Sequence, residues 1–204
     1  MSNNYPPYPQ QQRSSWFSGF FLRIKLVISI ICLWALCYSI NSIMKNSIAL
    51  EYDGGLADTT VSWNIMKTSG LKSHTPQYWK QLNGMAGEDP SKPVPGLMCL
   101  LAKFFGLKVL LICDRDPESG DILLSTWKKT VSEAYFAPEP NDKYMLLEKY
   151  RPFIYAASSD EGLAQAVKAG IIPLRIKRAA QTKIPGTYTP GKFGEKSIPL
   201  SHLH

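Results

Sequence analysis

The sequence predicts an α/β protein: a single N-terminal transmembrane helix followed by a Rossmann-like, three-layer domain with a mostly parallel sheet. Two patterns lead to this fold class. A long uncharged apolar run lies near the N-terminus, and from residue 48 onward short strand-like segments alternate with helix-like segments. At 204 residues, the chain has room for one membrane span and one compact domain.

Residues 1–22 are predicted to form a disordered cytoplasmic tail and membrane flank. The first fifteen residues are rich in Pro, Gln, Asn and Ser and nearly lack aliphatic side chains. Such a segment cannot bury enough apolar surface to offset the entropy lost on ordering. The aromatic residues between positions 16 and 21 suit the headgroup boundary of a bilayer.

Residues 23–45 are predicted to be a transmembrane signal anchor. Leu26–Met44 is a run of 19 residues without a charge, and at 1.5 Å per residue it covers about 28 Å, close to the hydrocarbon thickness of a bilayer. A cleaved signal peptide fits less well, because the run is longer than the usual apolar core and no small-x-small site follows it cleanly. A buried core helix would show an amphipathic period, which this run lacks.

The flanking charges predict the orientation of this span. Arg13, Arg23 and Lys25 precede the apolar core, whereas only Lys45 follows it closely. The positive-inside rule therefore predicts a single-pass inner-membrane protein with a cytoplasmic N-terminus and a periplasmic domain over residues 46–204. The expected partners are the membrane and either other envelope proteins or a second copy of the chain.

The basic balance of the chain comes mainly from the membrane flank. The formal net charge is +7, but residues 1–45 carry four basic residues and no acidic one, so 19 basic and 16 acidic residues leave +3 for the remainder. No run of Lys and Arg with interleaved aromatics occurs in the domain, and we expect no nucleic-acid partner. The three His residues have no recognised ligand spacing, which argues against a zinc site.

Strand and helix patterns alternate through the domain in the order expected of a parallel sheet. Short apolar runs predict the strands Ile48–Tyr52, Val109–Cys113, Ala134–Ala137, Phe153–Ala156 and Ile172–Ile176. Helical patterns predict the helices Pro76–Leu82, Gly96–Phe105, Ile122–Thr130, Lys143–Lys149 and Glu161–Ala169. The Gly- and Pro-containing segment 184–204 is expected to be irregular and to wrap the surface.

The loop that leaves the first strand is the expected place for chemistry. In α/β proteins, ligands lie beyond the carboxyl ends of the parallel strands. Asp53 follows the first strand and stands directly before the Gly54-Gly55 turn. Its carboxylate is therefore predicted to lie at this edge of the sheet.

The later part of the chain resembles a known family. Residues 151–200 run as strand, acidic loop, helix, Ala-Gly, strand and a closing Gly-x-Phe-Gly-Glu segment, which here is Gly191–Glu195. This order and spacing are similar to those of the haloacid dehalogenase (HAD) superfamily, and within it to the class B (subfamily IIIB) acid phosphatases. The resemblance covers residues 47–200, with shortening in the middle, and implies a HAD-like, acid phosphatase-type domain.

Transferred residue by residue, the first two catalytic motifs of the family are only partly present. Its D-x-D-x-T motif places the nucleophile on Asp53, but the second acid falls on Gly55 and the Thr on Ala57. Its Thr-Gly-Arg motif falls on residues 113–115, of which only Arg115 is kept. The resemblance therefore implies that Asp53 is a vestigial nucleophile position.

Of the third and fourth catalytic motifs, the sequence keeps the key residue of the third and lacks that of the fourth. The Lys that neutralises the nucleophile and the phosphate matches Lys143, whereas the metal-ligating Asp falls on Ala157. The resemblance implies catalytic or phosphate-binding roles for Lys143 and Arg115, with Asp160 in the acidic loop as a further binding residue. The carboxylates that are candidates to replace the lost acids are Asp58, which is the best placed, and Glu51, Asp114, Asp160 and Glu161.

These losses predict a catalytically degenerate domain. Phosphoryl transfer depends on positioned cations, and the loss of a general acid alone costs about 10²- to 10⁴-fold in rate. We expect no cofactor, and a membrane-anchored HAD-like pseudoenzyme that is a structural or binding component of a bacterial envelope assembly, such as one for secretion or conjugation. The alternative is an active, membrane-anchored, magnesium-dependent acid phosphatase or nucleotidase with a rearranged acid/base, in which Asp53 ligates the metal.

Two further groups of side chains have more than one interpretation. Cys99 opens a predicted helix and Cys113 ends the following strand, so they are either a disulfide or two buried thiols. Trp63, Tyr78 and Trp79 lie in the region where the family has a cap. We expect these aromatic side chains to be core residues rather than a substrate platform.

Overall fold

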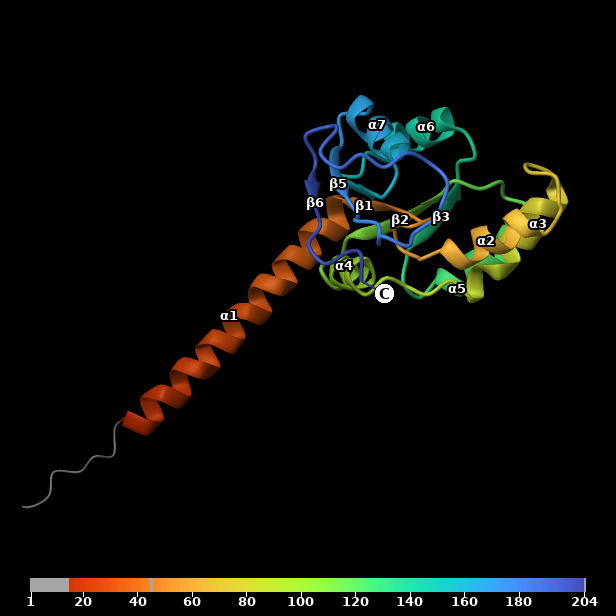
Figure 1. The fold of residues 1–204 in the computed structure, drawn as a ribbon. Coiled ribbons are helices and arrows are strands. Elements are labelled where there is room, and N and C mark those ends of the chain that lie inside the picture. The colour runs from red at the N-terminus through yellow and green to blue at the C-terminus, as the bar shows by residue number, and fades with distance from the viewer. Residues whose placement is uncertain (1–14, 45, 204) are drawn as a thin grey trace, which may run out of the picture.

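The computed structural model describes residues 15–44 and 46–203 (Figure 1). The predicted disordered tail falls largely on residues 1–14, which lie outside the described residues, as do Lys45 and His204. Within the described part, a wholly parallel sheet of six strands has the order β3-β2-β1-β4-β5-β6. The strands are β1 (Ser47–Glu51), β2 (Lys108–Cys113), β3 (Glu133–Phe136), β4 (Ile154–Ala157), β5 (Ile172–Arg175) and β6 (Lys196–Ser197).

Helices cover both faces of this sheet, which confirms the predicted three-layer α/β class (Figure 1). One face packs against α4 and α5, and the other against α6 and α7. Helices α2 and α3 lie beside α5, beyond the edge of the sheet near β3. The helices are α1 (Ser15–Met44), α2 (Thr60–Thr68), α3 (Pro76–Gly84), the 3₁₀ turn η1 (Met85–Gly87), α4 (Pro93–Phe104), α5 (Gly120–Trp127), α6 (Pro140–Tyr150) and α7 (Asp160–Lys168).

Strand β1 lies in the middle of the sheet because both of its faces are apolar. Successive side chains of a strand point to opposite faces. Ile48 and Leu50 therefore join the core beneath α4 and α5, and Ala49 joins the core beneath α6 and α7. Leu50 pairs with Leu111 of β2 on one side and with Ala156 of β4 on the other. A strand buried on both faces is typical of a parallel sheet.

The five predicted strands and five predicted helices of the domain are all present, and the differences lie in the ends and in missed elements. Helix α4 begins at Pro93 rather than Gly96, because proline is tolerated in the first turn of a helix. Helix α2, which has no counterpart in the prediction, begins at Thr60, after the turn that follows β1. The tail was expected to be irregular, but its Lys196–Ser197 segment pairs with β5 as an edge strand.

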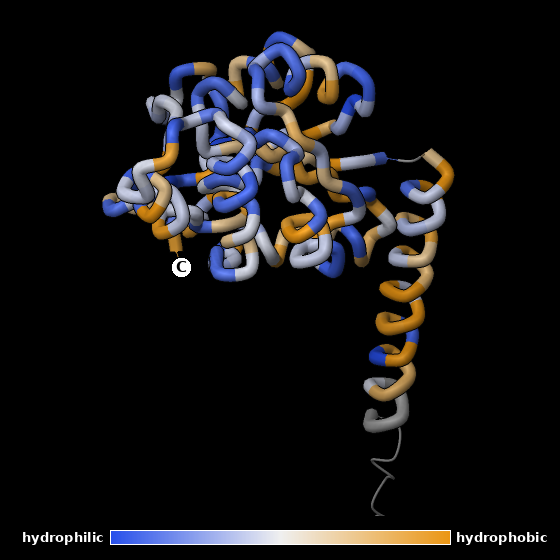
Figure 2. Tube along the Cα trace, turned by 90° about the vertical axis from the view of Figure 1, so that its right-hand side faces the viewer, coloured by the Kyte–Doolittle hydropathy of each residue, from blue (hydrophilic) through white to orange (hydrophobic). Residues whose placement is uncertain are grey.

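Helix α1 extends away from the domain and is apolar along most of its length (Figure 2). Among the described residues, Gly19–Met44 is long and apolar enough to cross a membrane, and none of its most apolar stretch is buried against the domain. The helix therefore includes residues 23–44 of the predicted span and continues toward the N-terminus beyond them. Its last turns contact α4, where the Trp34 indole N–H donates to the Phe104 carbonyl at 3.0 Å.

Cys99 and Cys113 are both free in the structure, so the disulfide alternative is not the one adopted. Cys99 lies in α4 and Cys113 ends β2, and both side chains belong to the core cluster beneath α4 and α5. Burial raises the pKa of the Cys99 thiol to about 12 and also raises that of Cys113. Both residues are therefore buried, neutral thiols that fill the core.

Candidate functional site

The candidate site lies where the loops after β1, β2 and β4 meet. The chain runs from β1 outward to β3 on one side of the sheet and then from β4 outward to β6 on the other. The carboxyl ends of β1 and β4 thus form a topological switch point, which is where open α/β sheets hold ligands. Glu51 ends β1 and Asp53 comes from the loop after it, Asp114 follows β2, and Ser158 and Ser159 follow β4.

Glu51, the last residue of β1, is the most heavily bonded carboxylate in this site. Its side chain is 1% exposed and accepts from five donor groups. Oε2 accepts from the Ser158 N–H at 2.7 Å, the Ser159 N–H at 2.9 Å and the Ser158 hydroxyl at 3.1 Å, and Oε1 accepts from the Ser159 hydroxyl and from Lys143 Nζ at 3.4 Å. Burial alone would raise the pKa of Glu51, but Lys143 and the serine donors hold it below its ordinary value.

Lys143 of α6 joins Glu51 to a second carboxylate, Asp114. The ammonium Nζ lies 2.6 Å from Asp114 Oδ1 and 2.8 Å from Oδ2, and the lysine side chain is 3% exposed. Burial raises the pKa of Asp114 to about 7. The negative charges of Glu51 and Asp53 also raise this pKa, whereas the positive charge of Lys143 lowers it. The single cation therefore lies between two carboxylates.

Asp53 faces a different cation, Arg115. The Arg115 Nη2–Asp53 Oδ1 distance is 2.7 Å and the Nε–Oδ2 distance is 3.0 Å, which is a bidentate ion pair. The Trp63 indole N–H also donates to Asp53 Oδ1 at 2.9 Å. Arg115 is fully buried, donates from Nη1 to the Leu82 carbonyl at 3.0 Å and lies over the Tyr52 ring.

This geometry favours a different register for the first motif. The expected nucleophile, Asp53, does not contact Lys143, because β1 ends at Glu51 and the chain turns directly after it, with the Leu56 N–H bonded to the Glu51 carbonyl. Glu51 is therefore the acid that meets the lysine. Glu51 and Asp53 have the acid-x-acid spacing of the D-x-D-x-T motif, and Gly55 then falls on the Thr position and not on the second acid.

In the fourth motif, too, the residue that faces the site is not the one expected from the sequence. Ala157, on which the metal-ligating Asp was placed, is the last residue of β4, and its methyl group is packed in the core beneath α6 and α7. Ser158 follows it and points into the site, where its hydroxyl lies 3.1 Å from Glu51 Oε2 and 3.2 Å from the Asp53 carbonyl oxygen. The residue opposite Glu51 is thus a serine.

Sequence reasoning treated Glu51 only as a surrogate acid and did not identify the two serines or Asp89. The Glu-x-Asp spacing and the Ser-Ser pair before an acidic helix start are signals that a different alignment would have used. Asp89, in contrast, has no signal in the sequence. It is buried, accepts from the Tyr52 hydroxyl at 2.9 Å and from the Ser62 hydroxyl, and lies 3.7 Å from Arg115.

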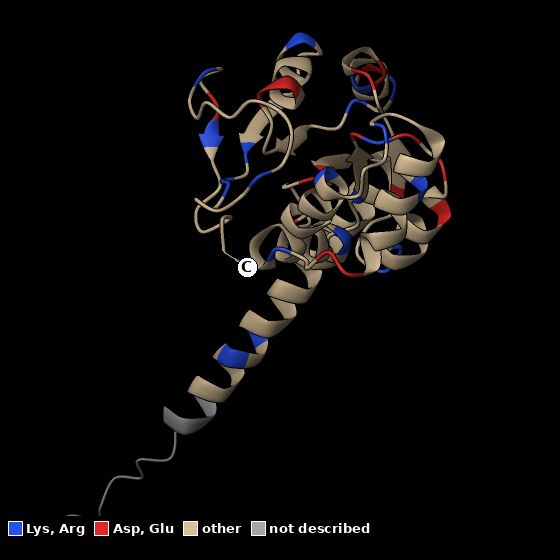
Figure 3. Cartoon of the chain, turned by 45° about the vertical axis from the view of Figure 1, so that its right-hand side comes forward, with Lys and Arg blue, Asp and Glu red and all other residues tan. Residues whose placement is uncertain are grey.

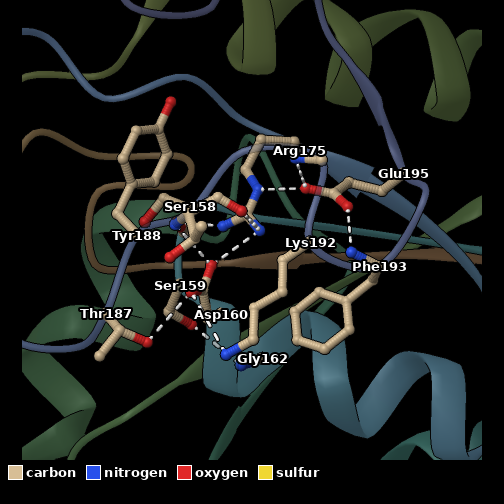
Figure 4. A network of polar contacts seen from close by, with 12 residues as sticks. Ser158, Ser159, Asp160, Gly162, Arg175, Thr187, Tyr188, Lys192, Phe193 and Glu195 are labelled. Carbon is tan, nitrogen blue, oxygen red and sulfur yellow. Dashed lines mark hydrogen bonds and ion pairs between the residues drawn. The ribbon is translucent and has the colours of Figure 1, made fainter.

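Asp160 does not lie with the other predicted site residues. It is 2% exposed, pairs with Arg175 at 2.8 Å and accepts from the Thr189 N–H at 2.9 Å (Figure 4). Burial alone would raise its pKa, but the Thr189 and Arg175 donors lower it to about 2. Arg175 also bonds Glu195 at 2.8 Å and the Ser158 carbonyl at 3.1 Å, so Asp160 helps to hold the C-terminal segment against the β4 loop.

The best-ranked surrogate, Asp58, also lies apart from this centre. Its carboxylate accepts from the Thr60 N–H at 3.1 Å and from the Thr60 hydroxyl at 2.6 Å, at the start of α2. Asp58 does not line the cavity over the strand ends, so it is not placed to replace an acid there.

A cavity of about 430 Å³ lies above these strand ends. Its floor includes Glu51, Asp53, Asp114 and Lys143, and one wall comes from Trp63, Tyr78 and Trp79 of α2 and α3. The three aromatic side chains are at most 8% exposed and pack together with Met66, Leu82 and Ile184. They are core residues, as expected, that also line the cavity.

The residues at the strand ends do not fit a magnesium ion. Magnesium takes an octahedral set of hard oxygen ligands, with carboxylates as the usual protein ligands. Both oxygens of Glu51 face N–H, O–H or ammonium hydrogens, which would repel a cation, and the opposite position carries Ser158. Within residues 15–44 and 46–203, no three His, Cys, Asp or Glu side chains are grouped closely enough to hold a metal.

No protein-family model matches the sequence, and no curated protein matches it. Solved structures match it by shape. CbbY from Rhodobacter sphaeroides in complex with phosphate has a TM-score of 0.54 at 13% identity, covering 77% of this chain and 95% of its own. A dehalogenase with an intermediate complex has a TM-score of 0.52 at 14% identity, covering 76% of this chain and 94% of its own.

A predicted phosphoglycolate phosphatase from Haemophilus somnus 129PT is similar to the same extent, with a TM-score of 0.53, 15% identity, and coverage of 76% of this chain and 95% of its own. At such identities, similarity of shape establishes the fold and neither subfamily nor activity. The class B phosphatase assignment therefore stays a prediction. The chain has the parallel-sheet, Rossmann-like fold of the HAD hydrolases, preceded by one apolar helix.

Proposed function

We propose that this protein is a membrane-anchored HAD-like pseudoenzyme that serves as a structural or binding component of a bacterial envelope assembly. The observation that carries the proposal is the bonding of Glu51. The acid at the first-motif position has both oxygens committed to five internal donors. A nucleophilic carboxylate needs a free oxygen that faces the phosphorus atom and a cation that is shared with the phosphate.

The second carboxylate supports the same proposal. A general acid must present a proton to the leaving group within about 3 Å. Both oxygens of Asp53 face Arg115, and Oδ1 also accepts from Trp63. Arg115 is fully buried and Lys143 is held by Asp114 and Glu51, so neither cation is free to bind a phosphate.

One observation favours the alternative, an active magnesium-dependent acid phosphatase or nucleotidase with a rearranged acid/base. Glu51, Asp53 and Lys143 all line the same cavity, and Asp53 retains 7% exposure. In that case the serine and arginine contacts would have to open when substrate binds.

The test is hydrolysis of p-nitrophenyl phosphate by the full-length chain in detergent micelles, with and without Mg²⁺, beside Asp53→Asn and Glu51→Gln variants. We expect the native chain to show no turnover above the two variants. Magnesium-dependent turnover that is abolished in either variant would overturn the pseudoenzyme proposal in favour of the phosphatase.

Membrane anchoring and its orientation are part of this proposal. The charged residues within α1 are the basic Arg23 and Lys25, which lie in the N-terminal half of the helix. Figure 3 shows the basic positions of this helix, in blue, on the half that is far from the domain. By the positive-inside rule, that half faces the cytoplasm and the domain lies in the periplasm, where it would meet other envelope proteins or a second copy. Alkaline phosphatase fused to the C-terminus should then be active in cells; an inactive fusion that is expressed in full would reverse the orientation.

A further inference from the structure

Helix α4 presents an apolar face that no other described element of the domain covers. Leu97, Leu100, Leu101 and Phe104 are 55%, 57%, 49% and 57% exposed, respectively. Their spacing of i, i+3, i+4 and i+7 places them on one side of the helix. The opposite side, with Cys99 and Ala102, is buried against the sheet. A contiguous apolar face of this kind marks a surface that meets another apolar phase.

The position of α4 beside α1 indicates what that phase is. The Trp34 indole N–H donates to the Phe104 carbonyl at 3.0 Å, and the two rings lie 5.3 Å apart. Asn41 Nδ2 donates to the Phe105 carbonyl at 3.0 Å. A Cβ on Gly106 would lie 2.8 Å from the Tyr38 carbonyl oxygen, so the following turn is also packed closely on α1.

These contacts set the depth of α4 along the apolar helix. Trp34 lies ten residues before Met44, the last residue of α1, which corresponds to about 15 Å of helix. The C-terminal end of α4 therefore lies alongside the apolar stretch of α1 and not beyond its end (Figure 1). If α1 spans a bilayer, this end of α4 must enter it.

Two neighbouring features fit a lipid environment. An apolar groove of about 200 Å³ runs between α4 and the start of the sheet, and its lining includes Met98, Leu101, Phe105 and Ile154. Lys103, which precedes Phe104 in α4, donates from its ammonium group to the Lys129 carbonyl at 2.7 Å, so one basic side chain lies beside the apolar face. Lysines in this position extend to the headgroups and attract anionic lipids.

We propose that α4 is a second membrane-binding element: its face of Leu97, Leu100, Leu101 and Phe104 inserts into the lipid leaflet next to the domain, beside α1. The inference rests on the proposed membrane anchoring of α1. Under this inference, the domain contacts the bilayer surface directly through α4, in addition to its connection to α1.

The test uses the full-length chain in vesicles of phosphatidylethanolamine and phosphatidylglycerol, with a nitroxide label on one introduced cysteine. Cys32 and Cys37 are first replaced by serine, and the parent without an added cysteine controls for labelling of the buried Cys99 and Cys113. Leu100→Cys probes the α4 face. Leu33→Cys reports the anchor, and Met145→Cys, which is on an exposed position of α6 across the sheet, reports water.

Collisions with oxygen, which concentrates in lipid, are compared with collisions with a water-soluble nickel chelate. We expect the label at position 100 to match that at position 33, with an oxygen-to-nickel ratio several-fold above that at position 145. A water-like ratio at position 100 with a lipid-like ratio at position 33 would overturn the inference and leave the anchor intact.

Two other results would also overturn it. A label at position 100 that is shielded from both reagents would mean that a second copy or another protein covers the face. A water-like label at position 33 would mean that α1 itself is not in the bilayer, and the anchoring proposal would fall together with this one.

Discussion

At the scale of single residues, the main feature of the site is the buried and fully hydrogen-bonded carboxylate of Glu51. A carboxylate that is 1% exposed is tolerated only when its oxygens are bonded, because an uncompensated buried charge costs several kcal/mol. Lys143 and the two serines supply that compensation. The same contacts that stabilise the buried charge also withdraw it from chemistry, so stability and loss of reactivity have one structural cause.

Replacing Glu51 by glutamine should therefore destabilise the domain strongly. The variant places an amide NH₂ among N–H and O–H donors and removes a negative partner of Lys143. Because both changes deprive buried polar groups of partners, we expect the free energy of unfolding to fall by about 3–5 kcal/mol. The measurement is urea unfolding of the full-length chain in micelles, followed by tryptophan fluorescence.

Glu133→Gln is the matched control for that change. Glu133 also pairs with a lysine, Lys108, but the two side chains are 36% and 51% exposed, and an exposed pair contributes at most about 1 kcal/mol. Equal losses in the two variants would contradict the buried-network interpretation.

The raised pKa of Asp114 predicts a dependence of stability on pH. Its pKa is about 7 in the folded chain against an ordinary value of 3.8, so the folded state binds a proton that the unfolded state releases between these values. The stability that this group contributes is full below pH 3.8 and is lost as the pH rises through 7. The advantage of the native chain over Asp114→Asn should shrink between pH 5 and pH 8 in urea unfolding.

Glu148→Gln, at an exposed position of α6, is the control for a carboxylate-to-amide substitution outside the site. A difference between native and Asp114→Asn that stays constant from pH 5 to pH 8 would argue that Asp114 is ionised throughout.

At the scale of elements, the turn after β1 places the two carboxylates on different cations. The Gly55 N–H bonds the Tyr52 carbonyl at 3.2 Å, and a Cβ at Gly55 would lie 2.0 Å from the Glu51 carbonyl oxygen. Only glycine allows this approach. The tight turn directs Glu51 toward Lys143 and Asp53 toward Arg115, although one residue separates the two acids in sequence.

Gly55→Ala should disrupt this turn at a cost of about 3 kcal/mol or more, since the methyl group meets backbone atoms that cannot move aside. Gly84→Ala is the control: it ends α3, nothing lies within 4 Å of its added Cβ, and alanine favours a helix by about 0.5–1 kcal/mol. Thermal unfolding of the two variants beside the native chain tests this. A Gly55→Ala chain as stable as Gly84→Ala would contradict it.

The sequence predicts the elements of this fold better than it predicts the site. Apolar runs and Gly or Pro boundaries locate β1 to within one residue at each end, because burial on both faces leaves a clear pattern. Helix α2 was missed because its apolar face, with Trp63 and Met66, packs on α3 and not on the sheet. Strand β6 is too short for any periodicity.

The register of the site could not be settled in the same way. The choice between Glu51 and Asp53 as first acid depends on which residue ends the strand, and strand ends are uncertain by a residue or two from pattern alone. A shift of one residue turns a strand side chain from the site into the core, which is what separates Ser158 from Ala157.

At the scale of the whole molecule, Arg175 connects the C-terminal segment to the loop after β4. Its guanidinium bonds the Ser158 carbonyl beside the site, Asp160 at the start of α7, and Glu195 in the C-terminal segment (Figure 4). Glu195 also accepts from the Gly191 and Phe193 N–H groups at 2.9 Å. The tail is therefore tied to the loop that holds Glu51, and the site depends on a segment that lies about 140 residues later.

Arg175→Met should release this segment. The change leaves Asp160 and Glu195 without their buried cation, for which we expect a loss of about 3–5 kcal/mol and faster proteinase K cleavage between residues 179 and 203. Lys192→Met is the control, because Lys192 is 52% exposed and lies 3.9 Å from Asp160. Unchanged cleavage in the Arg175 variant, as judged by mass spectrometry, would show that the tail is held by other contacts.

The join between α1 and β1 has a mechanical consequence. Asn46 donates from its backbone N–H to the Asn41 carbonyl at 3.3 Å and from its side chain to Asn41 Oδ1 at 2.9 Å, so the central strand starts directly from the last turns of the helix. A force along the helix therefore acts on β1, which is hydrogen-bonded to β2 on one edge and to β4 on the other. Both sets of inter-strand hydrogen bonds resist that force together. Because α1 continues almost directly into a central strand of the sheet, tension on the helix or a change in its tilt is transmitted to β1, the strand that carries Glu51.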